Sequence, residues 1–394
     1  VDQGATISLD GGKTFTPWYN QATGQFYHVT TDDRFPYVAY AEQQDSGTVA
    51  VPSRSDYGRI SYRDWFSVGG FEFGYIAPDP QDANTVFATG WFGTIVRYEK
   101  TTGQINFAFV PGDKYRSFAP PMQFSPQDKQ TLYMGTQFVM KTSDRGVTWK
   151  EISPDLTVKA EKSGEGKKGG GEEDEFEGDA EQAAARKGMI TALSLSPVQE
   201  GEIWAGTGNG LVQMTRDAGA SWQNVTPAGL PEKTQVLMIE SSHHDANTAY
   251  MAVKVKKDDH PYFYRTHDAG KSWQVIASGL PDSMFARVVR EDPVRRGMLY
   301  AGTENAVYVS FDDGDHWNSL QLNLPTASMR DLAVRGDDLV VATFGRALWV
   351  LDDVTPLRQF GPEVTTSDAY LFQSRDAVRW RWDNNQETPL PSEV

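Results

Sequence analysis

Short apolar segments alternate with turns along most of the chain. An x-Pro turn such as Asp292-Pro293 is followed by an apolar stretch that ends in small residues, as at 299–303. A polar turn then leads to a further apolar stretch, for example at 306–310. Short runs that are rich in β-branched and aromatic residues, and that are bounded by turn residues, predict strands. The chain is therefore predicted to be all-β.

A second pattern recurs together with the strands and reads Ser/Thr-x-Asp-x-Gly-x-Thr/Ser-Trp/Phe. It occurs at residues 8–15, 142–149, 215–222 and 266–273, with a divergent copy at 310–317. The carboxylate can accept hydrogen bonds from the turn and from the hydroxyl group, and glycine can take the positive φ that a tight hairpin needs. The aromatic ring can anchor the outgoing strand. We therefore interpret the motif aspartates as structural: Asp10, Asp144, Asp217, Asp268 and Asp312.

The spacing of these aspartates gives the length of the repeating unit. Asp217, Asp268 and Asp312 follow one another at intervals of 51 and 44 residues, and each interval fits one four-stranded blade of a β-propeller. A count of the units predicts seven antiparallel blades, with eight as the alternative. The predicted blades begin near Phe26, Phe71, Arg116, Gly188, Thr234, Phe285 and Met329.

We assign residues 1–354 to the propeller and expect residues 1–25 to complete its last blade. That blade has only three apparent strands and no motif, whereas the N-terminal segment has a motif without a blade of its own. Such closure would remove the open sheet edges. Residues 159–187 form an acidic, low-complexity insert whose second half predicts a short helix. Residues 355–394 leave the repeat and are predicted to form an extended strap or linker.

The recurring motif resembles the Asp-box, or BNR repeat, of sialidase-like, sortilin-like (VPS10-like) and xyloglucanase-like propellers. Residues 1–358 resemble the second propeller of large secreted bacterial proteins usually labelled glycosyl hydrolase or sortilin N-terminal domain-containing. The matching stretches are 24–29, 35–37, 43–45, 64–70 and 345–353. The resemblance implies an extracytoplasmic protein (secreted, periplasmic or at the cell surface), with another propeller N-terminal to this one. The chain is therefore expected to be a piece of a longer protein.

Charge and composition exclude several functions. The net charge of −16 argues against binding to nucleic acid or to an anionic membrane surface. The chain has no cysteine, which excludes disulfides and thiol catalysis, and no apolar run long enough to cross a bilayer. We assign no cofactor and no metal, because the clusters at 243–245 and 258–260 lack a spacing that fixes a metal geometry.

Asp45 is the first candidate for catalysis. It lies in the turn Gln44-Asp45-Ser46-Gly47, which is similar to the Gly-Asp-x-Gly turn that carries a catalytic acid in xyloglucanase-like tandem propellers. Glycosidases need two carboxylates across the scissile bond. Asp64 and Glu72 are local candidates for the second one, and the resemblance implies that it belongs to the N-terminal propeller. The structural alternative is an aspartate that caps a turn.

Aromatic residues provide the binding candidates. Seven of them cluster in and near Gly-rich turns of the early blades: Trp65, Phe66, Phe71, Phe73, Tyr75, Trp91 and Phe92. They are expected either to line the propeller mouth and contact sugars or a peptide, or to pack between blades. The leading hypothesis is a non-catalytic binding or assembly module whose top-face loops recognise a protein or a glycan. Its partner would be the N-terminal propeller or a protein complex. The alternative is a glycoside hydrolase of endo-xyloglucanase type with Asp45 as the acid.

Overall fold

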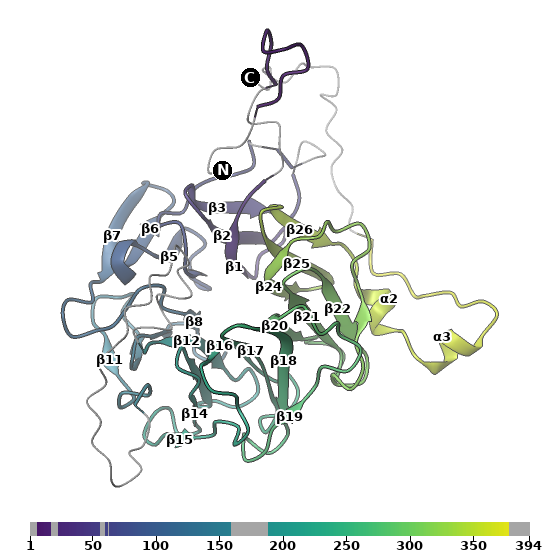
Figure 1. Cartoon of the computed structure of the whole chain (residues 1–394). Coiled ribbons are helices and arrows are strands. Elements are labelled where there is room, and N and C mark those ends of the chain that lie inside the picture. The colour runs from purple at the N-terminus through teal and green to yellow at the C-terminus, as the bar shows by residue number, and fades with distance from the viewer. Residues whose placement is uncertain (1–5, 17–22, 56–59, 62, 159–187, 378–394) are drawn as a thin grey trace.

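The structure, a computed structural model, describes residues 6–16, 23–55, 60–61, 63–158 and 188–377. In this part of the chain the strands form seven antiparallel sheets, and they follow one another around a ring (Figure 1). Five sheets have four strands and two have three. The predicted seven-bladed, all-β propeller is therefore confirmed.

The first three blades contain the following strands. Blade 1 consists of β1 (Phe26–Thr31), β2 (Val38–Gln43) and β3 (Gly47–Pro52). Blade 2 consists of β4 (Ile76–Pro78), β5 (Thr85–Thr89), β6 (Ile95–Glu99) and β7 (Gln104–Phe109), with the short 3₁₀ helix η2 (Trp91–Gly93) between β5 and β6. Blade 3 consists of β8 (Met122–Phe124), β9 (Leu132–Gly135), β10 (Val139–Thr142) and β11 (Lys150–Glu151).

The other four blades complete the ring. Blade 4 consists of β12 (Ile190–Leu195), β13 (Ile203–Thr207), β14 (Val212–Thr215) and β15 (Gln223–Asn224). Blade 5 consists of β16 (Thr234–Ser241), β17 (Ala249–Val255), β18 (Asp258–Thr266) and β19 (Gln274–Val275). Blade 6 consists of β20 (Ala286–Glu291), β21 (Leu299–Thr303), β22 (Val307–Ser310) and β23 (Asn318–Ser319). Blade 7 consists of β24 (Ser328–Arg335), β25 (Asp338–Phe344) and β26 (Leu348–Leu351).

Burial explains the continuous apolar runs of the sequence. The second strands β5, β13 and β21 are buried at every position, because each blade is covered on both faces by its neighbours. A strand buried on both faces reads as an unbroken apolar run. The outer strands of blades 3 to 6 are only two residues long and mostly exposed. The core of the molecule therefore lies between the blades.

The five motif turns have the same hydrogen bonds. In the copy at 142–149, Thr142 Oγ1 donates to Asp144 Oδ1 at 2.7 Å, and the amide of Gly146 donates to Thr142 Oγ1 at 3.0 Å. Thr148 donates to Asp144 through both its amide and its hydroxyl group, at 2.9 and 2.6 Å. These bonds lower the pKa of Asp144 to about 2. The Asp144 carboxylate thus accepts hydrogen bonds from both ends of the turn at 142–149.

Each motif tryptophan also connects its blade to the preceding one. Its ring nitrogen Nε1 donates to a main-chain carbonyl of that blade at 2.7–2.9 Å. The four pairs are Trp149 with Ala108, Trp222 with Ile152, Trp273 with Val225, and Trp317 with Ile276. The glycine of the same motif lies directly against the same residue of the preceding blade, with no room for a Cβ atom. We call this repeated contact the tryptophan joint.

Blades 1 and 7 close the ring by packing side by side. Phe26, Val29 and Ala39 share an apolar cluster with Val340 and Ala342. Gln25 forms a bridge with Phe344, and the amides of Gly345 and Ala347 donate to the carbonyl of Gly24. Residues 6–16 pair with themselves in an exposed hairpin and lie away from the ring, at the top of Figure 1. Residues 24–25 contact blade 7, and the completion of that blade by residues 1–25 stays a prediction, because residues 1–5 and 17–22 lie outside the described part of the chain.

The C-terminal region is described over residues 355–377, and the predicted strap or linker at 355–394 stays a prediction. It begins with two short helices, α2 (Thr355–Arg358) and α3 (Pro362–Thr366), and is extended only after them. Proline in the first turn of each helix favours a helix start, because its φ angle suits the helix and its missing N–H costs no hydrogen bond there. Arg358 attaches α2 to the propeller through ion pairs with Asp292 and Asp337, at 2.9 and 2.6 Å. The insert at 159–187, with its predicted helix, lies outside the described residues.

Candidate functional site

The candidate residues gather on one face of the ring, which we call the top face. It is formed by the starts of the innermost strands and by the turns between second and third strands. Three segments of it matter here: the β2–β3 turn at 44–46, the loop at 69–75 that leads to β4, and the β5–β6 turn at 90–94. They place predicted residues from blades 1 and 2 next to one another.

Asp45 and Glu72 meet on this face. Asp45 has a positive φ of 61°, which turns the chain between β2 and β3. Its amide donates to Glu72 Oε2 at 2.6 Å, and Gln44 Nε2 donates to the same oxygen at 3.2 Å. Burial raises the pKa of Glu72, and a hydrogen bond with the Asp45 carboxyl group raises it further. Carboxyl groups in hydrogen-bond contact are too close to act on opposite sides of a glycosidic bond.

Asp64, the third predicted catalytic residue, belongs to a separate turn. Its carboxylate accepts hydrogen bonds from Ser55 Oγ and from the amide of Ser61, both at 2.7 Å. These bonds are those of an aspartate that stabilises a local loop. Asp64 therefore does not join the pair formed by Asp45 and Glu72.

Aromatic rings form a continuous row beside Asp45 and Glu72. We call this set the aromatic row; it consists of Phe344, Tyr27, Phe73, Phe71, Trp91 and Phe92. Successive ring centroids lie 5.3, 6.3, 5.5, 3.3 and 5.9 Å apart in that order. Phe118 of the loop before β8 stacks on Phe73 at 4.8 Å. Trp91 and Phe92 are 59% and 77% exposed, so one end of the row is open to a ligand.

The other three predicted aromatic residues have different surroundings. Tyr75 stacks on His28 at 3.8 Å and donates to the carbonyl of Thr191 in blade 4, so it packs at the centre of the ring. Phe66 forms an isolated antiparallel β-bridge with Ala50, and the ammonium group of Lys100 lies over its ring. Trp65 is 57% exposed but contributes no ring to the row. Sequence reasoning missed Tyr27, Phe118 and Phe344, because they come from segments far from 65–92.

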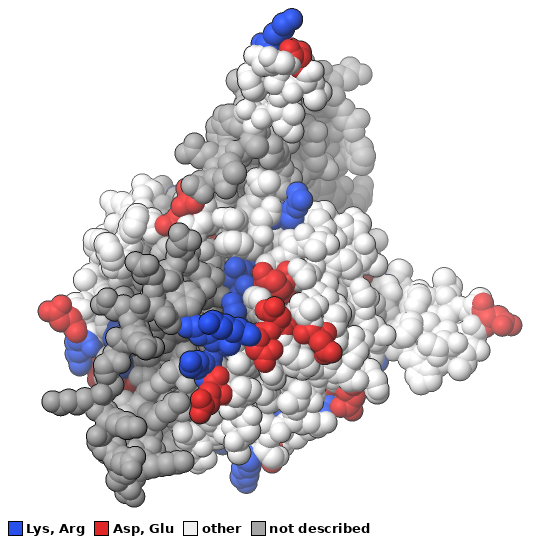
Figure 2. All heavy atoms as spheres, in the orientation of Figure 1, with Lys and Arg blue, Asp and Glu red and all other residues white. Residues whose placement is uncertain are grey.

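Cationic side chains extend the row toward blades 5 to 7. The guanidinium group of Arg330 lies over the rings of Phe344 and Tyr27, at 4.2 and 5.6 Å. Lys254 and Arg287 both lie 4.4 Å from the ring of Phe285. Arg330 is the extra residue at a register shift in β24, and such a bulge re-aims a side chain. Figure 2 shows Lys and Arg side chains next to Asp and Glu side chains near the centre of the visible face.

The innermost strands carry a buried ion-pair network below this face. Arg290 on β20 pairs with Glu240 on β16 at 2.7 Å and with Asp331 on β24 at 2.8 Å. Burial alone would raise the pKa of Asp331, but the charge of Arg290 holds it below its ordinary value. Asp331 also accepts a hydrogen bond from the amide of Val29 in blade 1. The network therefore joins blades 5, 6, 7 and 1.

The described residues contain no group of three or more His, Asp or Glu side chains arranged to hold a metal ion. His243 contacts Glu240 at 3.2 Å, His244 contacts the carbonyl of Asp292 at 2.9 Å, and His260 contacts Asp282 at 3.3 Å. The clusters at 243–245 and 258–260 thus contact protein groups on the blades. Helices long and apolar enough to span a membrane are not found in the described part of the chain.

Comparison with known proteins identifies the fold. The GH74 xyloglucanase from Xanthomonas campestris aligns with 85% of this chain at a TM-score of 0.61 and 17% identity, and the GH74 enzyme of Niastella koreensis aligns with 84% at 0.56 and 14%. This chain spans about half of each enzyme, 52% in both cases. YCF48 bound to D1 peptide aligns over 89% of this chain and 99% of its own length, at a TM-score of 0.57 and 12% identity. No protein-family model and no curated protein matches the chain. These similarities establish a shared propeller fold.

Proposed function

We propose that this protein is a non-catalytic binding propeller that holds a protein or glycan ligand on its aromatic row. The observation that carries the proposal is the row itself, in which six rings from blades 1, 2 and 7 adjoin and end in the exposed Trp91 and Phe92. Exposed aromatic rings next to polar side chains are typical of binding surfaces, because the rings bury a large area at a small cost in conformational entropy.

The neighbouring structures support a binding role without choosing the ligand. All three share the fold; one is bound to a peptide, one is a GH74 xyloglucanase and one is a GH74 enzyme. The carboxyl groups of this face favour binding over catalysis, because Asp45 and Glu72 are in contact rather than separated across a substrate.

Matched tryptophan variants test the proposal. Binding of soluble β-glucans and of a peptide library is measured by fluorescence and calorimetry with the wild type, Trp91→Ala and Trp65→Ala. Trp91 and Trp65 are almost equally exposed, but only Trp91 belongs to the row. We expect Trp91→Ala to weaken binding about tenfold, as for a central aromatic contact. Trp65→Ala should bind as the wild type does, and equal losses in both variants would contradict the proposal.

A second function, glycoside hydrolysis, is favoured by one observation. Glu72 has a raised pKa and lies beside the aromatic row together with Asp45, which suits an acid that needs a partner carboxylate on another propeller. Assays of the full-length protein on β-glucans decide between the two functions. Turnover that disappears with Asp45→Ala would establish hydrolysis and overturn the non-catalytic assignment.

We also propose that the protein acts outside the cytoplasm, next to an N-terminal propeller of the same protein or within a complex. This proposal is supported by the resemblance of the motif turns to the Asp-box of sortilin-like and BNR-repeat proteins. Expression of the gene with its native N-terminal sequence, followed by fractionation, provides the test. Recovery from the periplasm, the cell surface or the medium is expected, and recovery from the cytoplasm would contradict it.

A further inference from the structure

Three of the four tryptophan joints have the same kind of residue at the carbonyl that accepts the hydrogen bond, and the fourth has a smaller one. In blades 3, 4 and 5 the residue that accepts the tryptophan hydrogen bond is Ile152, Val225 or Ile276, each a buried branched aliphatic residue. In blade 2 the same position holds Ala108. Alanine lacks the methyl groups that fill the other joints, so a smaller side chain lies between blades 2 and 3, although the hydrogen bond and the contact with the motif glycine are both formed.

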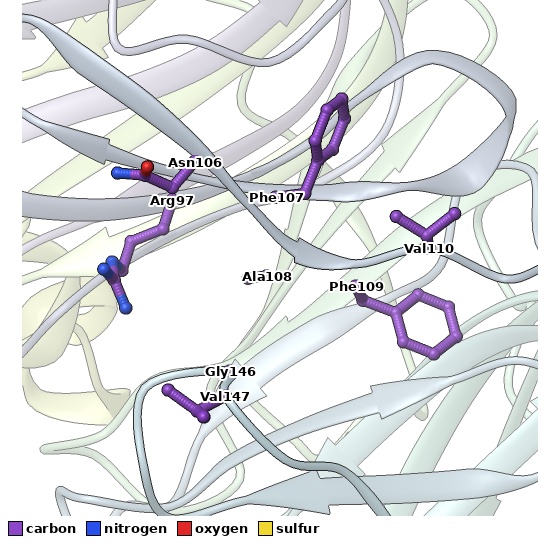
Figure 3. Close-up of a pocket in the computed structure, with 8 residues that line it drawn as sticks. All are labelled: Arg97, Asn106, Phe107, Ala108, Phe109, Val110, Gly146 and Val147. Carbon is purple, nitrogen blue, oxygen red and sulfur yellow. The ribbon is translucent and has the colours of Figure 1, made fainter.

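An open hollow of about 400 Å³ lies at this joint (Figure 3). Its lining includes Ala108 and Phe109 of β7, Val110, and Gly146 and Val147 of the motif turn in blade 3. Figure 3 shows Phe109 and Val110 on one side of Ala108, Arg97 on the other, and Val147 across from them. The hollow is large enough for an aliphatic side chain. Apolar side chains stand around Ala108, whereas Arg97, Asn106 and main-chain groups make the rest of the exposed lining polar.

The strand beside the hollow is an unusual outer strand. β7 has six residues, whereas the outer strands of blades 3 to 6 have two. It has no charged residue and no proline, and Ile105 and Phe107 are 57% and 73% exposed. Natural proteins normally protect such an edge with charges, proline, a bulge or a short strand, because free main-chain groups pair with other strands. In β7 this protection is limited to a bulge at Ala108, where the register with β6 shifts, so residues 104–107 present an edge next to the hollow that fits a partner strand.

We propose that the β7 edge and the hollow bind an extended segment of a partner protein, which pairs with β7 and inserts an isoleucine or valine side chain beside Ala108. The molecule itself indicates this side chain, because Ile152, Val225 and Ile276 fill the other three joints. Addition of a strand to a sheet edge gives affinity through main-chain hydrogen bonds and specificity through alternate side chains. This surface is separate from the aromatic row and adds a second contact to the molecule.

The charge of Arg97 and the geometry of a two-fold dimer indicate which kind of partner segment fits the hollow. Arg97 is the charged residue of the lining; it pairs with Glu99 at 3.2 Å and donates to the carbonyl of Arg145. A lysine or arginine of the partner would be repelled there. A second copy of this chain could pair through β7 in an antiparallel dimer with a two-fold axis. An axis at Asn106 would bring Gln104 opposite Ala108, and an axis at Phe107 would bring Asn106 opposite Ala108. Neither is aliphatic, so a heterologous segment fits the hollow better.

A peptide array on the intact protein tests the proposal. The probes are octapeptides that alternate threonine and valine, with one central position varied through all residue types. We expect isoleucine and valine at that position to bind best, and lysine and arginine to bind at least tenfold more weakly. Absence of binding by every peptide at millimolar concentration, or affinity that does not depend on the central residue, would overturn the proposal.

Two variants locate the binding to the hollow. Ala108→Ile supplies the side chain found at the other joints, so it should fill the hollow and weaken peptide binding at least tenfold. Val147→Glu, at a residue that is 74% exposed, should have the same effect without disturbing the core. Val294→Glu, at a similarly exposed valine in blade 6, is the matched control and should bind normally. Normal binding by Val147→Glu would place the peptide elsewhere.

Light scattering separates the partner segment from a second copy. The wild type should remain monomeric at the concentrations used for the array. A dimer that dissociates with Phe107→Ser would assign the β7 edge to self-association and overturn the proposed partner. The Trp91→Ala variant keeps the β7 edge unchanged. A loss of binding to the aromatic row in that variant therefore leaves the binding of peptides to the β7 edge as it is, and the two proposals are tested independently.

Discussion

At the scale of single residues, the hydrogen bonds of the motif aspartate are local to its own turn. Asp217 accepts hydrogen bonds from the hydroxyl group of Thr215 and from both the amide and the hydroxyl group of Ser221. Donors at fixed sequence offsets allow this geometry to be predicted without any tertiary information. The destination of the motif tryptophan could not be predicted in the same way, because its acceptor lies in the preceding blade.

The lowered pKa of Asp217 predicts an acid-sensitive contribution to stability. The folded-state value of about 2 lies below the ordinary value of 3.8, so the carboxylate stabilises the fold above about pH 4. This contribution is lost as the pH falls through about 2. We expect Asp217→Asn to lower the melting temperature at pH 7 and to approach the wild type below pH 3. Thermal unfolding monitored by circular dichroism measures the difference, and a gap that is constant with pH would contradict the assignment.

At the scale of strands and loops, the sequence indicates which segments form blades but not which side chains meet. Second strands and motif turns follow from apolar runs and local spacing. The aromatic row and the hollow at Ala108 depend on how loops from blades 1, 2, 3 and 7 approach one another. Tyr27 and Phe344, for example, lie at opposite ends of the repeat and meet only because the ring closes. Ala108 likewise looks unremarkable until its equivalents in three other joints are known.

The innermost strands provide a prediction about the ion-pair network. Arg290→Met leaves the carboxylates of Glu240 and Asp331 buried without their partner. Removal of one member of a buried pair costs about 3–5 kcal/mol, so we expect a loss of this size in the free energy of unfolding in urea. Arg296→Met is the control, because Arg296 forms an exposed pair with Asp245 that is worth less than about 1 kcal/mol. Equal losses in both variants would disprove a special role for the network.

At the scale of the whole molecule, the number of blades could be predicted from the sequence. The side chains that join the first blade to the last could not. Interval lengths between motifs give the blade count, because each blade is a unit of similar length. Closure depends on contacts between segments about three hundred residues apart, such as Tyr37 with Asp338 and Val29 with Asp331. No local pattern records such contacts. The helices α2 and α3 lie outside the repeat, so the spacing of the motifs carries no information about them.

The packing of blade 1 against blade 7 predicts a tolerance to truncation. The described hairpin at 6–16 is largely exposed, and the contacts with blade 7 begin at Gly24. Removal of residues 1–22 should therefore change the melting temperature by less than about 2 °C, whereas removal of 1–31 takes away β1 and should unfold the ring. A large loss on the shorter deletion would instead support completion of the last blade by the N-terminal segment.

The direction of the tryptophan bonds has a consequence for synthesis on the ribosome. In every joint of the described chain, the ring comes from the later blade and the carbonyl from the earlier one. We therefore expect the outer strands of blades 2 to 5 to be fixed in place only after the motif turn of the following blade has been synthesised. Assembly would then follow translation from the N-terminal side, one blade behind it. Blade 7 carries no motif and would be fixed last, when it packs against blade 1.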